Sequence, residues 1–369
     1  MQPFTLAWAE GKPPVELARA CLEELPPDAA GLALVYATDA LADGFAEVLA
    51  TLRAARPQVD WVGTVGTGLC LPGREIYDRP ALALLLTGLG RAHYRLLGGD
   101  LDDFPPALLE WCGEHAGAFA LVHGDPTDAT TPVLVQRLAA LDGVGFVNGG
   151  LTASRSVHVQ AAGVVHRGGL SGVLLSPSVE LLTDHTQGCL PIGPPHALTE
   201  ARGNLAVRLD GRPALAVLRE EVGEVMARDL ARIAGYVFAA LPVPRTDTGD
   251  YLVRNLVGID PQRQLVAIGD DLEDQPQLMF CRRDGNTARE DLERMLQRVQ
   301  RRLAGRPVRG GVYVSCVARG RHQFGANSEE LRAVHAALGE FPLAGFFANG
   351  EIYNGRLYGY TGVLTLFVG

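Results

Sequence analysis

The sequence predicts an α/β fold with two mixed-sheet domains built from repeated strand–helix–strand–strand units, and no transmembrane segment. Short apolar runs of strand length alternate with helices whose apolar residues recur every three or four positions. Glycines end several strands, and one order of elements returns three times along the chain. With 369 residues, the chain is long enough for two domains that each bury a core.

The first copy of the repeat begins near the N-terminus. Pro13 and Pro14 favour the first turn of a helix, Pro26 stops that helix, and Asp39 can cap the next one. In chain order, we expect a strand at 5–9, a helix at 15–25, a strand at 32–37, a helix that ends near residue 55, a glycine-rich stretch at 61–68 and a strand at 81–86.

The second and third copies follow the same order. We expect strand 119–124, helix 131–141 and strand 145–150 in the second, and strand 312–316, helix 329–338, strand 343–348 and closing strand 360–368 in the third. The first and third copies share a string, since Glu75-Ile-Tyr-Asp78 resembles Glu351-Ile-Tyr-Asn354. We predict that the two strings occupy equivalent positions, and that the second copy has no carboxylate there.

The segment between the second and third copies differs in character. Residues 188–195 are too rich in glycine and proline for a regular helix. A turn at 210–213 marks a boundary, so the predicted domains are 1–212 and 213–369. After it we expect a helix at 214–236, a hairpin of 251–257 and 264–268 around Asp260-Pro261, a strand at 277–281 and an amphipathic helix at 287–303.

The composition argues against several function classes. A formal net charge of −9 is unlike that of a nucleic-acid-binding protein, which presents a basic face. Lys12 is the only lysine, and it lies in a proline-rich loop. Schiff-base, P-loop and kinase chemistries that need a lysine are therefore nearly excluded.

The cysteines and the N-terminus indicate the compartment. The six cysteines lie far apart and form no Cys-x-x-Cys pair. The N-terminus lacks the basic flank and apolar core of a signal peptide, and no apolar run reaches transmembrane length. We expect a reduced, cytoplasmic protein without membrane contact.

Recognisable catalytic motifs are absent, so we assign no catalytic residue and no metal ligand. The residues around Cys189 are the exception to consider, because Cys189 with His185 or His196 could form a nucleophile–base pair or a metal site. The simpler interpretation is a rigid loop at 187–196 that covers a pocket, with Cys189 as a small buried apolar group.

Charged side chains follow two strands of the third copy. Glu351 comes directly after the turn Asn349-Gly350, and Arg319 follows strand 312–316. Such an arginine suits the capture of a carboxylate or phosphate, and a solvated loop arginine is the alternative. Arg282-Arg283, after strand 277–281, allows the same two interpretations.

A series of segments, in order along nearly the whole chain, resembles the FIST family, whose members have paired FIST N and FIST C domains. The segments that resemble the N half are 32–37, 62–75, 148–151 and 187–194; those that resemble the C half are 280–283, 316–320, 324–325, 342–352 and 360–367. Many relatives have a histidine shortly before the threonine of the closing strand, whereas this chain has Tyr358-Gly-Tyr-Thr361.

The resemblance implies a sensory domain of signal transduction that binds small ligands such as amino acids. One bacterial branch binds haem and senses nitric oxide, so a haem-based sensor is an alternative, as is a Cys189-dependent enzyme. With no F-box and no output domain in the sequence, the protein would signal through a separate partner, a histidine kinase or a cyclic-dinucleotide enzyme.

The expected ligand site combines charged residues with the glycine-containing strand ends. Glu351 and Glu75 would take an amine or guanidinium of the ligand, and Arg319 a carboxylate, because burying a zwitterion requires partners of both signs. The remaining residues expected at the site are Asn349, Gly350, Asn148, Gly149, Gln187, Gly188, Cys189, Gly193 and Thr361.

Overall fold

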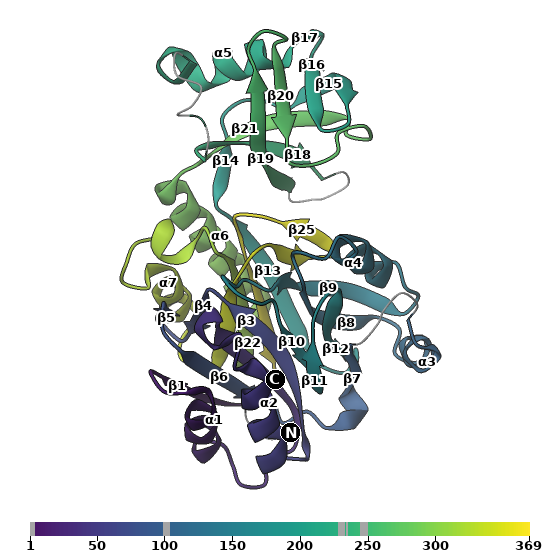
Figure 1. Cartoon of the computed structure of the whole chain (residues 1–369), viewed down its shortest axis with the longest axis vertical. Coiled ribbons are helices and arrows are strands. Elements are labelled where there is room, and N and C mark those ends of the chain that lie inside the picture. Colours follow the sequence, from purple (N-terminus) through teal and green to yellow (C-terminus); the bar gives the residue numbers. More distant parts are fainter. Residues whose placement is uncertain (1–3, 99–103, 228–232, 234, 244–249) are drawn as a thin grey trace. The chain divides into compact units, whose positions relative to one another are not determined.

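A computed structural model describes residues 4–98, 104–227, 233, 235–243 and 250–369 (Figure 1). The chain forms two compact units: unit 1 comprises residues 1–186 and 291–369, and unit 2 comprises residues 187–290. Unit 2 is thus an insertion in the chain of unit 1, and residue 212, the predicted domain boundary, lies within it. No helix in the described part of the chain is long and apolar enough to cross a membrane.

Unit 1 contains three six-stranded sheets of matching design. In strand order, sheet 1 consists of β1 (Thr5–Glu10), β6 (Ala81–Leu86), β2 (Gly31–Thr38), β3 (Val59–Gly66), β10 (Gln160–Ala162) and β11 (Val164–His166). Sheet 2 consists of β7 (Tyr94–Leu97), β12 (Leu170–Leu175), β8 (Ala118–Gly124), β9 (Val144–Leu151), β24 (Glu351–Tyr353) and β25 (Arg356–Tyr358). Sheet 3 consists of β13 (Leu181–Gln187), β26 (Thr361–Val368), β22 (Val308–Cys316), β23 (Leu343–Ala348), β4 (Gly68–Leu71) and β5 (Arg74–Tyr77).

Each repeat supplies four strands of one sheet and two helices. The helices are α1 (Pro14–Glu23) and α2 (Phe45–Ala55) in the first repeat, α3 (Pro106–Glu114) and α4 (Thr131–Ala139) in the second, and α6 (Gly285–Leu303) and α7 (Glu329–Leu338) in the third. Short 3₁₀ helices η1 (Asp39–Leu41), η2 (Arg91–His93) and η4 (Gly320–His322) lie in connecting loops. The threefold repeat predicted from the sequence is confirmed.

The three repeats exchange hairpins in a closed cycle. The hairpin β4–β5 of the first repeat joins sheet 3, the hairpin β10–β11 of the second joins sheet 1, and the hairpin β24–β25 of the third joins sheet 2. In every sheet the two central strands are parallel and the borrowed hairpin pairs antiparallel with one of them. No repeat completes its own sheet, so the three repeats form one unit.

One glycine in each repeat fixes the register of the central strands. Gly63, Gly149 and Gly345 pair with the neighbouring parallel strand so closely that a Cβ atom would lie 1.7, 1.8 and 1.8 Å from a carbonyl oxygen of that strand. These distances exclude any side chain. The glycines therefore mark equivalent positions in the three repeats.

These glycines correct the predicted equivalence of Glu75 and Glu351. Glu351 precedes the residue that pairs with Gly149. In the same way, Gln160 precedes the residue that pairs with Gly63, and Leu69 precedes the residue that pairs with Gly345. Glu75 lies instead on the second strand of its hairpin, where it pairs with Cys70. The shared string occupies different strands of the hairpin in the two repeats, because local sequence does not record the pairing.

A common core lies between the inner faces of the three sheets. It includes Tyr36, His123 and Phe346, one from each repeat, with ring centroids 5.2 to 5.8 Å apart. Helices α1 and α2 cover the other face of sheet 1, and α3 and α4 that of sheet 2, each pair with its own apolar cluster. Apolar faces on both sides explain why the central strands lack polar alternation.

Unit 2 is built on an antiparallel sheet, and its described residues include helix α5. Its strands are β14 (Cys189–Pro191), β21 (Gln277–Arg283), β15 (His196–Arg202), β16 (Leu205–Leu209), β20 (Leu265–Ile268), β19 (Tyr251–Asp260) and β18 (Val237–Pro242), with β17 (Arg212–Pro213) beside β16. Because β18 also pairs with β21, the sheet closes into a barrel. Helix α5 (Ala214–Ala227) is interrupted by a kink at Gly223, whose φ of 77° is not helical. Residues 228–232 and 234 of the predicted helix 214–236 lie outside the described residues.

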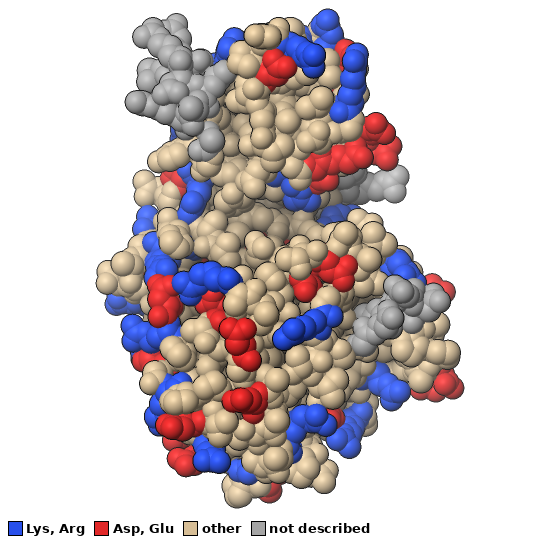
Figure 2. All heavy atoms as spheres, in the orientation of Figure 1, with Lys and Arg blue, Asp and Glu red and all other residues tan. Residues whose placement is uncertain are grey.

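Charged side chains of both signs are distributed over the surface. On the face shown in Figure 2, basic and acidic side chains are interspersed. Ion pairs at the surface of the described residues include Arg91 with Asp60 and Arg155 with Asp78. This distribution is typical of a solvated surface.

Candidate functional site

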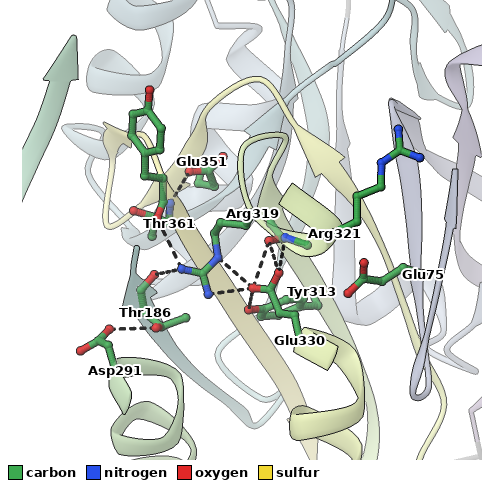
Figure 3. A network of polar contacts seen from close by, with 12 residues as sticks. Glu75, Thr186, Asp291, Tyr313, Arg319, Arg321, Glu330, Glu351 and Thr361 are labelled. Carbon is green, nitrogen blue, oxygen red and sulfur yellow. Dashed lines mark hydrogen bonds and ion pairs between the residues drawn. The ribbon is translucent and has the colours of Figure 1, made fainter. Parts of the chain in front are cut away.

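A buried ion pair connects the end of β22 with helix α7. Arg319 lies in the loop after β22, and Glu330 is the second residue of α7, so this connection brings the two together (Figure 3). Arg319 Nε donates to Glu330 Oε1 at 2.8 Å, and Nη2 lies 2.7 Å from the same oxygen. Both side chains are 0% exposed. Burying two charges costs several kcal/mol per ion, which only good geometry offsets.

Further hydrogen bonds surround the Glu330 carboxylate. Oε1 accepts from the Tyr313 hydroxyl at 2.8 Å, and the Ser315 hydroxyl lies 3.2 Å from both carboxylate oxygens. Oε2 accepts from the backbone N–H of Gly320 at 2.8 Å. Every oxygen of this buried group therefore has partners, as a buried charge requires.

The guanidinium of Arg319 is also fully surrounded. Nη1 donates to the carbonyls of Thr186 at 3.5 Å and Tyr360 at 3.4 Å, and the group lies 4.9 Å from the ring centroid of Phe324. Burial opposes its charge, but Glu330 outweighs burial and raises the pKa of Arg319. A ligand carboxylate at Arg319, as the sequence suggested, would have to displace Glu330.

Glu351, the first residue of β24, lies near this pair (Figure 3). Its side chain is buried; Oε2 accepts from the backbone N–H of Thr361 at 3.1 Å, while Oε1 has no hydrogen-bond partner among the described residues. Burial raises the pKa of Glu351 to about 8, against the opposing effects of the Thr361 N–H, Arg319 and Cys316. Burial therefore favours the protonated form of this carboxyl group.

Glu75 approaches the same region from the hairpin of the first repeat (Figure 3). Its Oε2 accepts from the Tyr77 hydroxyl at 2.8 Å, and its backbone N–H donates to Ser328 Oγ at 2.9 Å. Burial and the charge of Glu330 raise the pKa of Glu75 to about 7. The structure thus brings Glu75, Arg319 and Glu351 together around Glu330. Glu330 was not among the residues predicted from the sequence.

The other predicted site residues of unit 1 hold the hairpin β24–β25 in place. Asn148 Nδ2 donates to Thr183 Oγ1 at 2.6 Å, and its Oδ1 accepts from the N–H of Asn354 at 3.3 Å. The exposed Asn349 donates its N–H to a carbonyl of β9 at 3.1 Å, and Gly350 has a φ of 125° that a side chain would strain. Gly149 is the register glycine described above.

The internal repeat shows that these charges are not required by the fold. The position of Glu351 holds Gln160 in the second repeat and Leu69 in the first. The helices equivalent to α7 are α2 in the first repeat and α4 in the second. The first turn of α2 has one acidic residue, the exposed Glu47, and the first turn of α4 has none. Buried charges cost stability, and the other two repeats fold without an acidic residue at the positions of Glu351 and Glu330, so the fold does not account for these two side chains.

The remaining predicted site residues belong to unit 2. Gln187 Nε2 donates to the carbonyl of Tyr251 at 2.7 Å, and the Tyr251 hydroxyl donates to the carbonyl of Cys189 at 2.7 Å. Cys189 is buried beside Cys281, and their hydrogen bond and burial raise the pKa of Cys281. Gly188 lies between β13 and β14.

Unit 2 has a cavity of about 420 Å³ beside this segment. It is lined by Leu190, Pro191, Ile192, Glu221, Val222, Tyr236, Val237, Arg282, Arg283 and Asp284. Gly193 allows Glu221 its position, because a Cβ atom on Gly193 would lie 1.7 Å from Glu221 Oε1. The predicted loop therefore does line a pocket, and Arg282-Arg283 lie in the same cavity.

A carboxylate–imidazole–carboxylate chain leads to the cavity. His196 Nε2 lies 2.7 Å from Glu221 Oε1, and Nδ1 lies 2.6 Å from Asp210 Oδ2. Burial disfavours the charged imidazole, but Glu221 and Asp210 outweigh it and raise the pKa of His196. Since both ring nitrogens contact carboxylates, His196 is not paired with Cys189.

The described residues contain no group of three or more histidine, cysteine and acidic side chains that could hold a metal ion.

Glu221 Oε2 is buried and has no hydrogen-bond partner in the described ranges. The sequence did not predict Glu221 as a site residue, because it lies in the charged stretch Arg219-Glu220-Glu221, which is typical of an exposed helix face.

Comparisons with known proteins identify the family. The FIST N domain model matches residues 31–212, and the FIST C domain model matches residues 214–354. The chain is 30% identical over 383 residues to the uncharacterized protein Rv0628c of Mycobacterium tuberculosis H37Rv, covering 96% of this chain and 95% of that protein. It is 29% identical over 382 residues to the uncharacterized protein Mb0898c of Mycobacterium bovis, with the same coverage. FIST domains are generally sensory domains of signal transduction, and this chain belongs to the FIST family.

Proposed function

We propose that this FIST protein senses a small zwitterionic metabolite, an amino acid or a close relative, which binds in the cavity of unit 2. The cavity volume of about 420 Å³ lies within the range of about 300–1,000 Å³ that is usual for small-molecule sites. Its walls combine apolar side chains with a few charged groups, as such sites do.

The observation that carries this proposal is the position of Glu221. Glu221 and Arg282 both line the cavity, and the buried Oε2 of Glu221 has no hydrogen-bond partner among the described residues. A buried acceptor without a partner costs free energy that a donor on a ligand would recover. An ammonium group at Glu221 and a carboxylate at Arg282 would satisfy both charges of a zwitterion.

The chain through His196 supports the choice of an ammonium. Glu221 Oε1 is already bonded to His196, whose other nitrogen contacts Asp210, so the orientation of Glu221 is fixed and the ligand ammonium would bond to Oε2. Apolar atoms of Leu190, Ile192 and Val222 line the same cavity. They would contact the side chain of the ligand and distinguish it from polar metabolites.

Signalling follows if the ligand binds one conformation of the protein better than another. The proposed partner is a separate signalling protein, a histidine kinase or a cyclic-dinucleotide enzyme, in the cytoplasm.

A thermal-shift screen of the full chain with amino acids and related metabolites tests the proposal, because a ligand selective for the native state raises its melting temperature. The hits are then titrated against Glu221→Gln and the neighbouring, exposed Glu220→Gln. We expect Glu221→Gln to weaken binding at least about tenfold, the loss of about 1.4 kcal/mol typical of a charge-assisted hydrogen bond, and Glu220→Gln to bind like the parent. Equal affinity of both variants would exclude this cavity.

A further inference from the structure

We propose that Glu351 is a proton-binding site that makes the docking of the hairpin β24–β25 depend on pH, so that the third repeat is a pH-responsive element. This inference concerns unit 1 and is independent of the ligand proposed for unit 2. It rests on the surroundings of one carboxyl group, on the repeat, and on the hairpin to which the group belongs.

The surroundings favour a neutral Glu351. The cation that acts on it, Arg319, is engaged at 2.7 Å by Glu330, so Glu351 has no charge partner of its own among the described residues. Cys316 at the end of β22 faces it, and Tyr358 of β25 pairs with it in the hairpin register. On β26, the backbone N–H of Thr361 donates to Glu351, and on β9 the residue that pairs with Glu351 is Gly150. The raised pKa, about 8, agrees with this geometry.

The second repeat shows what a neutral group does at this position. Gln160, the neutral isostere of a glutamate, is buried at the equivalent position, where its Oε1 accepts from the Ser171 hydroxyl at 2.8 Å. The hairpin docks in the second repeat with a side chain that cannot ionise. Of the three equivalent positions, only that of the third repeat, Glu351, holds a side chain that can ionise.

Ionisation of Glu351 would act on the hairpin through solvation. A buried carboxylate without a cation is strongly disfavoured, so the ionised group is stable only where water reaches it. The hairpin can expose it by separating from β9, to which it pairs at Gly149 and Gly150. Glu351 is the end residue of that pairing, and Ile352 follows it into the core beside α3 and α4.

Hydrogen exchange of the full-length protein measures this opening. If opening exposes Glu351, the opening constant of peptide 351–358, corrected for intrinsic exchange, rises about tenfold per pH unit from pH 6 towards 8 and then levels off, because one proton is released. Glu351→Gln should remove the slope, and Glu340→Gln, an exposed change in the same repeat, should keep it. A parent slope of zero, or a slope that persists in Glu351→Gln, would overturn the proposal.

A direct titration keeps the test decisive if Glu351→Gln does not fold. The carboxyl carbon of Glu351 in the unaltered protein is followed by ¹³C NMR from pH 4 to pH 9. We expect a midpoint near pH 8, and a midpoint near the ordinary value of 4.5 would overturn the proposal.

Discussion

Glu330 Oε1 lies 2.7 Å from Arg319 Nη2, and neither side chain reaches solvent. The pair joins the loop after β22 to the first turn of α7, and among the described residues only the third repeat contains such a pair. Arg319 donates to the carbonyls of Thr186 and Tyr360 and so positions the surrounding backbone. The charge of Arg319 is neutralised within the protein by Glu330.

The first prediction concerns this pair. Glu330→Gln leaves the Arg319 charge buried without a counter-ion, so we expect a loss of about 3–5 kcal/mol in the free energy of unfolding, measured by urea denaturation. The double variant Arg319→Met/Glu330→Leu removes both charges and should be more stable than Glu330→Gln alone. If the double variant is the less stable of the two, the unpaired charge of Arg319 is not the cause of the loss.

The second prediction concerns the pH dependence of stability through Glu75. The pKa of Glu75 is raised from 4.5 to about 7 in the folded protein. The stability that comes from its protonated carboxyl group is therefore fully present below pH 4.5 and is lost as the pH rises through 7. Glu75→Gln should therefore be more stable than the parent at pH 8 and equal to it at pH 4.5. Thermal unfolding at both pH values measures the difference, with Glu340→Gln as the control, and equal stability of Glu75→Gln and the parent at pH 8 contradicts the prediction.

The third prediction concerns the close approach of Gly193 to Glu221. Gly193→Ala places a Cβ atom 1.7 Å from Glu221 Oε1, so the carboxylate must move and the ligand affinity should fall at least about tenfold, or about 1.4 kcal/mol. Gly258→Ala, also in unit 2, meets its nearest atom at 3.6 Å and serves as the matched control. Titration calorimetry with a hit from the ligand screen compares the two, and unchanged affinity of Gly193→Ala would show that Glu221 does not contact the ligand.

The fourth prediction concerns the register glycines. Gly345→Ala should destabilise unit 1 by about 3 kcal/mol or more, because its Cβ would lie 1.8 Å from the carbonyl oxygen of Tyr313. Gly113→Ala on α3 has open space and should stabilise by about 0.5–1 kcal/mol, since alanine favours a helix. Denaturant unfolding gives both values, and effects of the same sign would refute the register argument.

Local patterns in the sequence were sufficient for the elements and for the threefold repeat. Most strands and helices occur within a few residues of their predicted bounds, because apolar periodicity and glycine or proline boundaries are local signals. The exchange of hairpins among the repeats was not predictable in this way. It depends on pairings such as Gly345 with Cys70, far apart in sequence, which leave no periodicity to detect.

The candidate sites show the same limit. Glu351, Arg319 and Glu75 stood out because each is a charge next to a strand or a turn, and the structure places them together. Glu330 and Glu221 did not stand out, because an acidic residue in a helix is ordinarily solvated. Only tertiary structure shows that one is buried against Arg319 and the other against His196.

The central claim is that Glu221 receives the ammonium group of a ligand. Its most direct test is calorimetric titration of the parent and Glu221→Gln with an amino acid from the screen and with its N-acetyl derivative, which has lost the positive charge. We expect the parent to discriminate strongly against the N-acetyl form, and Glu221→Gln to lose most of that discrimination. If Glu221→Gln discriminates between the two compounds as strongly as the parent does, Glu221 does not receive the ammonium group.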